Sequence, residues 1–271
     1  MGEAVLNYAT YHNSNLSWML GRFILPSWRL AEFVEHAKDF YSKQDRGMWK
    51  LSVIDSGDLF DTLRRVEDFN AANAPFSKCD TLELKAETAG EIERAAEILP
   101  SYLTPYFEIA ADDSLSETVP ALLLARLRAK VRTGGIKPEA IPSSHDIARF
   151  MRTCLAAGVP FKATAGLHHP LRCVRPLTYE THSVKGKMHG FLNVFLAAAF
   201  IREGFKPALV EEILEEETPG AFVFENNGIW WRQEYFLGLP QLQRLRESCL
   251  VSFGSCSFTE PTEELQEMGI V

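Results

Sequence analysis

The chain alternates short runs of β-forming residues with helix-like segments over its first two thirds, and this alternation constrains the fold most strongly. Strands are predicted at residues 21–25, 50–54, 81–85, 105–109, 129–133 and 160–165. The intervening segments repeat apolar residues at helical spacing, as at Ile92, Ala95, Ala96 and Leu99. Strands that alternate with helices in this way favour a parallel sheet joined by right-handed crossovers.

The last third is less regular. Helices are predicted at residues 188–204, 207–216 and 240–247, and the dipeptide Asn227-Gly228 indicates a β-hairpin. Residues 221–225 would form an irregular seventh strand and residues 250–253 an eighth. With 271 residues and no Pro/Gly/Ser-rich linker, the chain suits one (β/α)8 TIM-type barrel domain over residues 1–271. An open doubly wound sheet is the alternative, but no G-x-G-x-x-G motif follows the first strand.

Composition excludes several classes of protein. The chain is 46% hydrophobic and 24% charged with a net charge of −8, which is typical of a globular protein and argues against a nucleic-acid-binding surface. Five scattered cysteines fit a reducing, cytoplasmic location, and the longest apolar run is too short for a membrane span of about 20 residues. A homo-oligomeric interface could use the aromatic residues Trp18, Trp28, Trp230, Trp231 and Phe236.

Charged residues recur on one face of four successive predicted strands. Side chains in a strand alternate between two faces, so the charged sets lie opposite the apolar ones. The charged residues are Glu83, Lys85, Glu108, Lys130, Arg132 and Lys162, and the polar residue Thr164 shares the face of Lys162. In a barrel they would point into the lumen, where buried charge requires a partner or a ligand. Their surplus of positive charge predicts a small anionic ligand, a carboxylate or a phosphate.

Loops after the predicted strands supply further candidates. His168 and His169 can transfer protons near neutral pH, and Arg172 can hold a carboxylate. The helix that follows is expected to contribute His189 and Asn193 to substrate binding. After the eighth strand, a phosphate-binding turn would use Gly254, Ser255 and Ser257. Cys256 in the same turn is not assigned a nucleophilic role.

Two strand motifs resemble those of a known enzyme family. FKATAG at residues 161–166 and KVRTGG at residues 130–135 look like the two lysine strands of class I deoxyribose-phosphate aldolases, although their order along the chain is reversed. The resemblance implies that Lys162 forms a Schiff base and that Lys130 is its electrostatic partner. With AKVRTGG, FKATAGLHH and FGSCS, the whole chain also resembles an uncharacterised bacterial barrel family.

Three functional hypotheses follow. The first is a lyase of the aldolase type that acts on a small anionic carbonyl compound without a cofactor or metal. Lys162 would be the nucleophile, Lys85 a reserve, and Glu83 or Glu108 the proton carrier. The second is a metal-dependent hydrolase or isomerase that uses Glu83, Glu108, His168, His169 and His189 as ligands. The third is a non-catalytic protein that binds a small anion.

Overall fold

The computed structural model describes residues 1–41 and 47–271. The chain divides into two compact units. The first comprises residues 1–86 and 90–107, and the second comprises residues 87–89 and 108–271.

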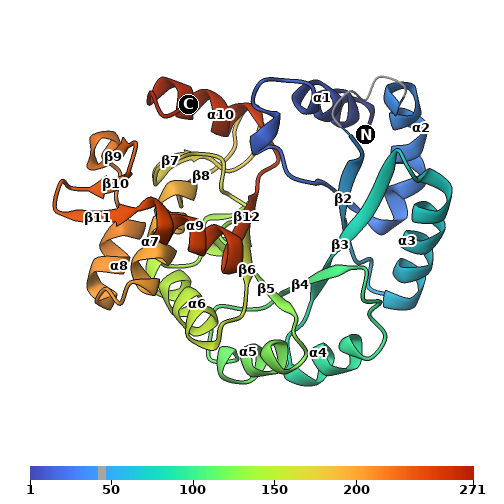
Figure 1. The fold of residues 1–271 in the computed structure, drawn as a ribbon, viewed down its shortest axis with the longest axis horizontal. Coiled ribbons are helices and arrows are strands. Elements are labelled where there is room, and N and C mark those ends of the chain that lie inside the picture. The colour runs from blue at the N-terminus through green and yellow to red at the C-terminus, as the bar shows by residue number, and fades with distance from the viewer. Residues whose placement is uncertain (42–46) are drawn as a thin grey trace. The chain divides into compact units, whose positions relative to one another are not determined.

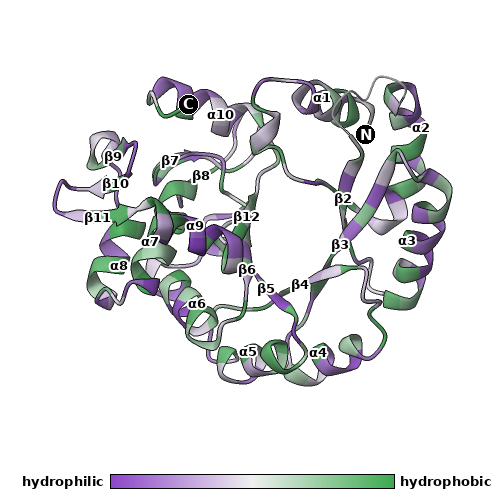
Figure 2. Cartoon of the chain, viewed as in Figure 1, coloured by the Kyte–Doolittle hydropathy of each residue, from purple (hydrophilic) through white to green (hydrophobic). Residues whose placement is uncertain are grey.

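The first unit contains parallel strands in the order β1-β2-β3-β4 (Figure 1). These are β1 (Phe23–Pro26), β2 (Trp49–Ile54), β3 (Ser77–Lys85) and β4 (Thr104–Glu108), whose last residue belongs to the second unit. Two elements precede β1, namely helix α1 (Gly2–His12) and the 3-10 turn Ser17–Met19. The strands are connected by the 3-10 turn Ser27–Arg29 and by helices α2 (Leu30–Tyr41), α3 (Leu59–Asn73) and α4 (Ala89–Ala96). Helices α2 and α3 carry both hydrophobic and hydrophilic residues, as expected for helices with one face against a sheet (Figure 2).

Trp49 is the centre of the aromatic core of this unit. Its side chain is 1% exposed. The rings of Tyr8, Phe33 and Tyr41 pack against it at steep angles, with centroid distances of 5.1, 6.2 and 6.1 Å. Edge-on contacts of this kind are the preferred geometry of aromatic pairs. They join α1 and α2 to the sheet.

The second unit contains the parallel strands β5 (Arg128–Arg132), β6 (Phe161–Thr164) and β12 (Leu250–Gly254). Strand β6 pairs in parallel with β5 on one side and with β12 on the other. The helices of this unit are α5 (Leu115–Leu124), α6 (Ser144–Ala157), α7 (Phe191–Arg202), α8 (Pro207–Leu214), α9 (Leu239–Ser248) and α10 (Thr259–Glu267). Two short 3-10 turns lie at Pro138–Ala140 and Pro219–Ala221.

Two small antiparallel sheets complete the second unit. Strands β7 (Cys173–Pro176) and β8 (Lys185–Met188) form one hairpin. Strands β9 (Phe222–Glu225), β10 (Gly228–Trp231) and β11 (Tyr235–Gly238) form a three-stranded sheet in the order β11-β10-β9. The hairpin predicted around Asn227-Gly228 is therefore confirmed.

The predicted α/β fold with a parallel sheet is confirmed, but the predicted eight-stranded ring is wrong. Residues 222–225, expected to be the seventh parallel strand, pair in antiparallel fashion with β10 instead. Strand β12 then takes the position next to β6. In the described residues the parallel strands thus number seven, β1 to β6 and β12. The hairpin meets the hydrogen-bonding requirement of this segment locally, so the segment needs no place in the parallel sheet.

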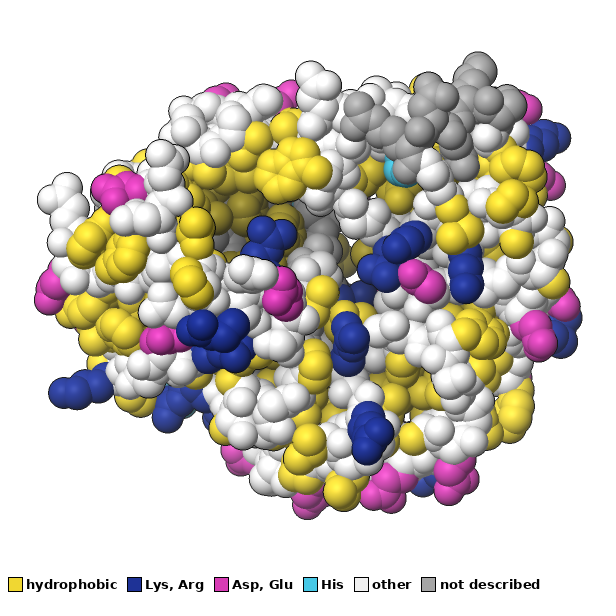
Figure 3. Space-filling view, viewed as in Figure 1, with side chains coloured by type: hydrophobic (Ala, Val, Ile, Leu, Met, Phe, Trp, Pro, Cys, Tyr) yellow, Lys and Arg dark blue, Asp and Glu magenta, His cyan; other side chains and the backbone are white. Residues whose placement is uncertain are grey.

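On the face drawn in Figure 3, acidic side chains are scattered rather than gathered in one patch. Of the aromatic residues considered for an interface, Trp18 and Trp28 are 66% and 61% exposed, whereas Trp231 is fully buried. Among the described residues, no helix combines the length and the apolar character required to cross a membrane.

Helix α6 provides a test of local structure. The Ser143 hydroxyl oxygen accepts a hydrogen bond from the backbone N–H of Asp146 at 3.1 Å and caps the first turn. We expect Ser143→Ala to lower the free energy of unfolding by about 1 kcal/mol, measured by urea denaturation. Ser143→Thr keeps the acceptor and should lose much less. Equal losses in the two variants would contradict a capping role.

Candidate active site

Two lysines lie side by side on neighbouring strands of the second unit. Lys130 on β5 and Lys162 on β6 are register partners in the parallel pairing. Partners in register point to the same face of a sheet, so both ammonium groups lie on one side. Lys130 is 6% exposed and Lys162 is 5% exposed. Lysine is among the residues least often buried, and a buried ammonium group requires a charged or hydrogen-bonding partner.

Glu108, the last residue of β4, supplies a negative charge to this face. Its Oε2 lies 2.8 Å from Nζ of Lys130. The same oxygen is 4.0 Å from Nη1 of Arg132, the last residue of β5. The Glu108 side chain is 20% exposed and that of Arg132 is 53% exposed, so both are accessible to a ligand. Glu108, Lys130, Arg132 and Lys162 are hereafter called the lysine site.

Glycines allow the loops after β5 and β6 to approach closely. A Cβ on Gly134 would lie 3.1 Å from the Cα of Gly166, so the backbones of the two loops are in close contact. Ala165 and Gly166 both have positive φ, 65° and 76°. The Thr133 hydroxyl donates to the carbonyl of Ala165 at 2.6 Å and fixes this turn. A non-glycine residue in the left-handed region is strained, and such strain is common beside functional sites.

Thr164 and Gly254 close the same edge. Thr164 is the last residue of β6 and is 8% exposed. It is the register partner of Gly254 at the end of β12, and a Cβ on Gly254 would lie 3.1 Å from the Thr164 methyl group. The loops that follow β6 and β12 therefore start next to each other.

His168 joins these two loops. Its Nδ1 is 3.2 Å from Oε2 of Glu260 and 3.2 Å from the hydroxyl of Ser255. The Sγ of Cys256 is 3.6 Å from Nε2 of His168. The Tyr179 hydroxyl donates to Glu260 Oε2 at 2.9 Å. His168, Tyr179, Ser255, Cys256 and Glu260 are hereafter called the thiol cluster.

Hydrogen bonds and charges within the thiol cluster shift the pKa values of two of its groups. The hydrogen bond with Cys256 raises the pKa of His168 above its ordinary value, against the opposing effect of burial, and Glu260 raises it further. Partial burial raises the pKa of the Cys256 thiol, but its hydrogen bond with His168 and the charge of that ring outweigh burial and leave the pKa below its ordinary value. Both shifts favour a thiolate beside an imidazolium.

Other residues predicted to bind substrate have structural partners. The Arg172 guanidinium pairs with Glu215 at 2.9 Å and donates to the Ser144 hydroxyl at 3.0 Å. Asn193 is fully buried. Its amide donates to the carbonyls of Ile213 and Glu216 at 2.7 and 2.8 Å. These contacts hold the loop after β6 against α6, α7 and α8.

Two more predicted residues stabilise the loops around helix α10. Nδ1 of His169 lies 2.7 Å from Oε1 of Glu264 on that helix. The Ser257 hydroxyl accepts from the backbone N–H of Glu260 at 3.1 Å, in the first turn of the helix.

Glu83 and Lys85 belong to the first unit. Glu83 is 3% exposed and accepts a hydrogen bond from the Ser52 hydroxyl at 2.8 Å. Lys85, the last residue of β3, is exposed. The carboxylates and histidines considered as metal ligands each have different partners. In residues 1–41 and 47–271, no group of three or more His, Cys, Asp or Glu side chains is arranged to hold a metal ion.

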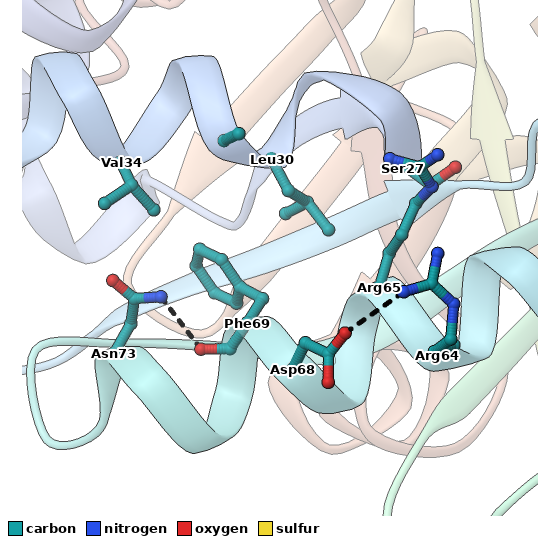
Figure 4. Close-up of a pocket in the computed structure, with 9 residues that line it drawn as sticks. Ser27, Leu30, Val34, Arg64, Arg65, Asp68, Phe69 and Asn73 are labelled. Atoms are coloured by element: carbon teal, nitrogen blue, oxygen red, sulfur yellow. Dashed lines mark hydrogen bonds and ion pairs between the residues drawn. The ribbon is translucent and has the colours of Figure 1, made fainter.

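A shallow groove in the first unit is separate from all of these residues. It lies between α2 and α3, and Arg64 at its edge pairs with Asp68 at 3.4 Å (Figure 4). The lining residues are Ser27, Leu30, Ala31, Val34, Arg64, Arg65, Asp68, Phe69 and Asn73. None of the residues predicted to bind or react lies there.

Sequence reasoning missed Tyr179, Cys256 and Glu260. The sequence signal for this cluster is a pair of motifs, His168-His169 after β6 and Ser255-Cys256 after β12. Their side chains can be predicted to meet only if β6 and β12 are known to be neighbours. The expected seventh strand would have separated them.

His189 yields a prediction about pH. It is 2% exposed, and its Nε2–H donates to the Pro142 carbonyl at 2.8 Å. Burial lowers the pKa of this ring below its ordinary value, and the Arg172 charge lowers it further, although the bond to Pro142 opposes the shift. Below about pH 6.5 the unfolded chain binds a proton that the folded ring does not, so stability falls as the pH decreases.

We therefore expect His189→Gln to lose less thermal stability than the parent protein between pH 7 and pH 5.5. Differential scanning calorimetry at both pH values measures the difference. His182→Gln is the control, since His182 is exposed. The same loss of Tm in His189→Gln as in the parent would show that this ring does not cause the pH dependence.

Comparison with known proteins identifies no family for this chain. No family model matches the chain, and no curated protein matches it. Among solved structures, a histidine-to-alanine mutant of D-threo-3-hydroxyaspartate dehydratase is similar over 60% of this chain, with a TM-score of 0.32 and 15% sequence identity. The chain covers 51% of that protein, about half its length.

Proposed function

We propose that the protein is an enzyme of the lyase class that acts on a small anionic carbonyl compound through a Schiff base on Lys162. One observation carries the proposal. Lys162 and Lys130 are buried side by side in register, and Glu108 contacts Lys130 at 2.8 Å. The resemblance of the two strand motifs to class I aldolases favours the same chemistry.

The lysine site provides the groups that this chemistry requires. A cation beside a lysine favours the neutral amine, which is the nucleophilic form. The Lys162 amine would attack the substrate carbonyl carbon, and loss of water would give the imine. Glu108, partly exposed and next to Lys130, would carry the protons of these steps. Lys130 would stabilise negative charge that develops on the substrate.

Arg132 and the strand ends would bind the substrate. The Arg132 side chain is 53% exposed, and guanidinium groups bind carboxylate and phosphate well. The Thr164 hydroxyl, on the register partner of Arg132, would add a hydrogen bond. The site would then lie at the carboxyl ends of parallel strands, where α/β proteins commonly bind ligands. A cytoplasmic location is part of the proposal, since all five cysteines are free.

Borohydride reduction tests the nucleophile. The protein is incubated with glyoxylate, pyruvate or glycolaldehyde phosphate, reduced, and analysed by peptide mass spectrometry. We expect one reduced adduct, located on Lys162, because an imine is the species that borohydride converts into a stable amine. Lys162→Ala should abolish the adduct, whereas Lys50→Ala, which removes an exposed lysine, should keep it. An adduct that survives in Lys162→Ala, or no adduct with any of these compounds, would contradict the proposal.

Glu108 can be tested separately. Glu108→Gln removes the proton carrier but keeps the size of the side chain. We expect adduct formation to slow by about 100-fold while the adduct stays on Lys162. Glu117→Gln, an exposed substitution on α5, is the matched control. An unchanged rate in Glu108→Gln, measured by quenching with borohydride at successive times, would exclude the carboxylate from the reaction.

A further inference from the structure

The thiol cluster is a second group of reactive side chains, distinct from the four residues of the lysine site. Cys256 lies two residues beyond the end of β12 and is exposed. Cys79 and Cys154, in contrast, are buried, and burial raises the pKa of both thiols. A reagent from solution can therefore reach the Cys256 sulfur while it cannot reach those two.

The geometry connects a nucleophile, a base and a carboxylate. The Cys256 sulfur lies 3.6 Å from Nε2 of His168 and 3.7 Å from Nδ1, and Nδ1 also lies 3.2 Å from Glu260 Oε2. When Nδ1 carries the proton shared with Glu260, Nε2 is free to take the proton of the thiol. Nucleophilic acyl transfer uses this division of roles between the two ring nitrogens.

Surrounding residues hold this arrangement in place. The Tyr179 hydroxyl donates to Glu260 at 2.9 Å and lies 3.7 Å from the Cys256 sulfur. The Ser255 hydroxyl lies 3.2 Å from Nδ1 of His168. Glu260 belongs to the first turn of α10, which begins at Thr259. Its backbone N–H donates a hydrogen bond to the Ser257 hydroxyl. The carboxylate is therefore fixed by backbone as well as by side-chain contacts.

From these contacts we infer that Cys256 is a nucleophile for small activated acyl compounds, esters or thioesters, and that His168 is its general base. The Cys256 sulfur forms a bond to the acyl carbonyl carbon, and the bond from that carbon to the leaving oxygen or sulfur breaks. The leaving group takes the proton that His168 received from the thiol. Water, activated by His168, then attacks the thioester, releases the carboxylic acid and restores the thiol.

Glu260 is a positioning residue in this scheme. It acts through Nδ1 of His168 and does not touch the acyl group. Loss of its charge should alter the pH dependence of the reaction rather than the place of modification. That distinction separates positioning from a purely structural role.

p-Nitrophenyl acetate is the probe. We expect a burst of one nitrophenolate per protein and a mass increase of one acetyl group on the peptide that contains Cys256. Neutral hydroxylamine should remove this group, because it cleaves thioesters but not the amides that acylated lysines form. Cys256→Ser should lose the hydroxylamine-sensitive adduct, and Cys173→Ala, at another incompletely buried cysteine, should keep it.

His168→Gln should slow acylation at pH 7 by about 100-fold and raise the midpoint of the pH–rate profile, because the thiol then loses the partner that lowers its pKa. Glu260→Gln should also shift that midpoint, while the adduct stays on Cys256. Acetylation confined to lysines, a hydroxylamine-sensitive adduct in Cys256→Ser, or an unchanged profile in His168→Gln would overturn the inference. Circular dichroism of each variant establishes that it is folded.

Discussion

The parallel pairing of β6 with both β5 and β12 is the constraint on which both reactive groups depend. Pairing with β5 places Lys162 beside Lys130, and pairing with β12 places Thr164 beside Gly254. Because parallel strands end at the same edge, the loops with His168 and Cys256 begin as neighbours. The short approach between Gly134 and Gly166 keeps this edge free of bulky side chains.

The partners of the polar side chains distinguish residues proposed to react from residues that hold the fold together. Arg172, Asn193 and His189 are largely buried, and they contact backbone carbonyls and amides, Glu215 and Ser144. They fasten the loop after β6 to the helices. Glu108, Arg132 and Cys256 retain exposure together with charge or nucleophilic character. Lys162 and Lys130 are also buried, but they lie in register next to Glu108 and Arg132, which are accessible to a ligand.

Sequence periodicity predicts much of this organisation. The six strands and the period-two alternation of apolar and charged residues are legible because a residue's face in a strand depends only on its spacing. The pairing of Lys130 with Lys162 follows from that pattern once the strands are neighbours. The Asn227-Gly228 hairpin is likewise a local signal.

Strand order is what the sequence could not supply. Residues 222–225 are as β-prone as a parallel strand. Asn227-Gly228 indicates a hairpin with β10, but a strand has two edges, so this local signal does not exclude a parallel pairing with β6 as well. Tertiary packing decides the pairing partner of this segment, and the pairing determines which loops become neighbours. A strand between β6 and β12 would separate His168 from Cys256, and the position of the Gly-Ser-Cys-Ser turn after an eighth strand indicates a phosphate loop rather than half of a nucleophilic pair.

The central claim is that Lys162 is the reacting amine of a site for small anionic carbonyl compounds. A crystal structure of the protein reduced by borohydride in the presence of glyoxylate tests it most directly. We predict continuous electron density from Nζ of Lys162 into a carboxymethyl group whose carboxylate contacts Arg132. Density on an exposed lysine such as Lys50, with Lys162 unmodified, would contradict it.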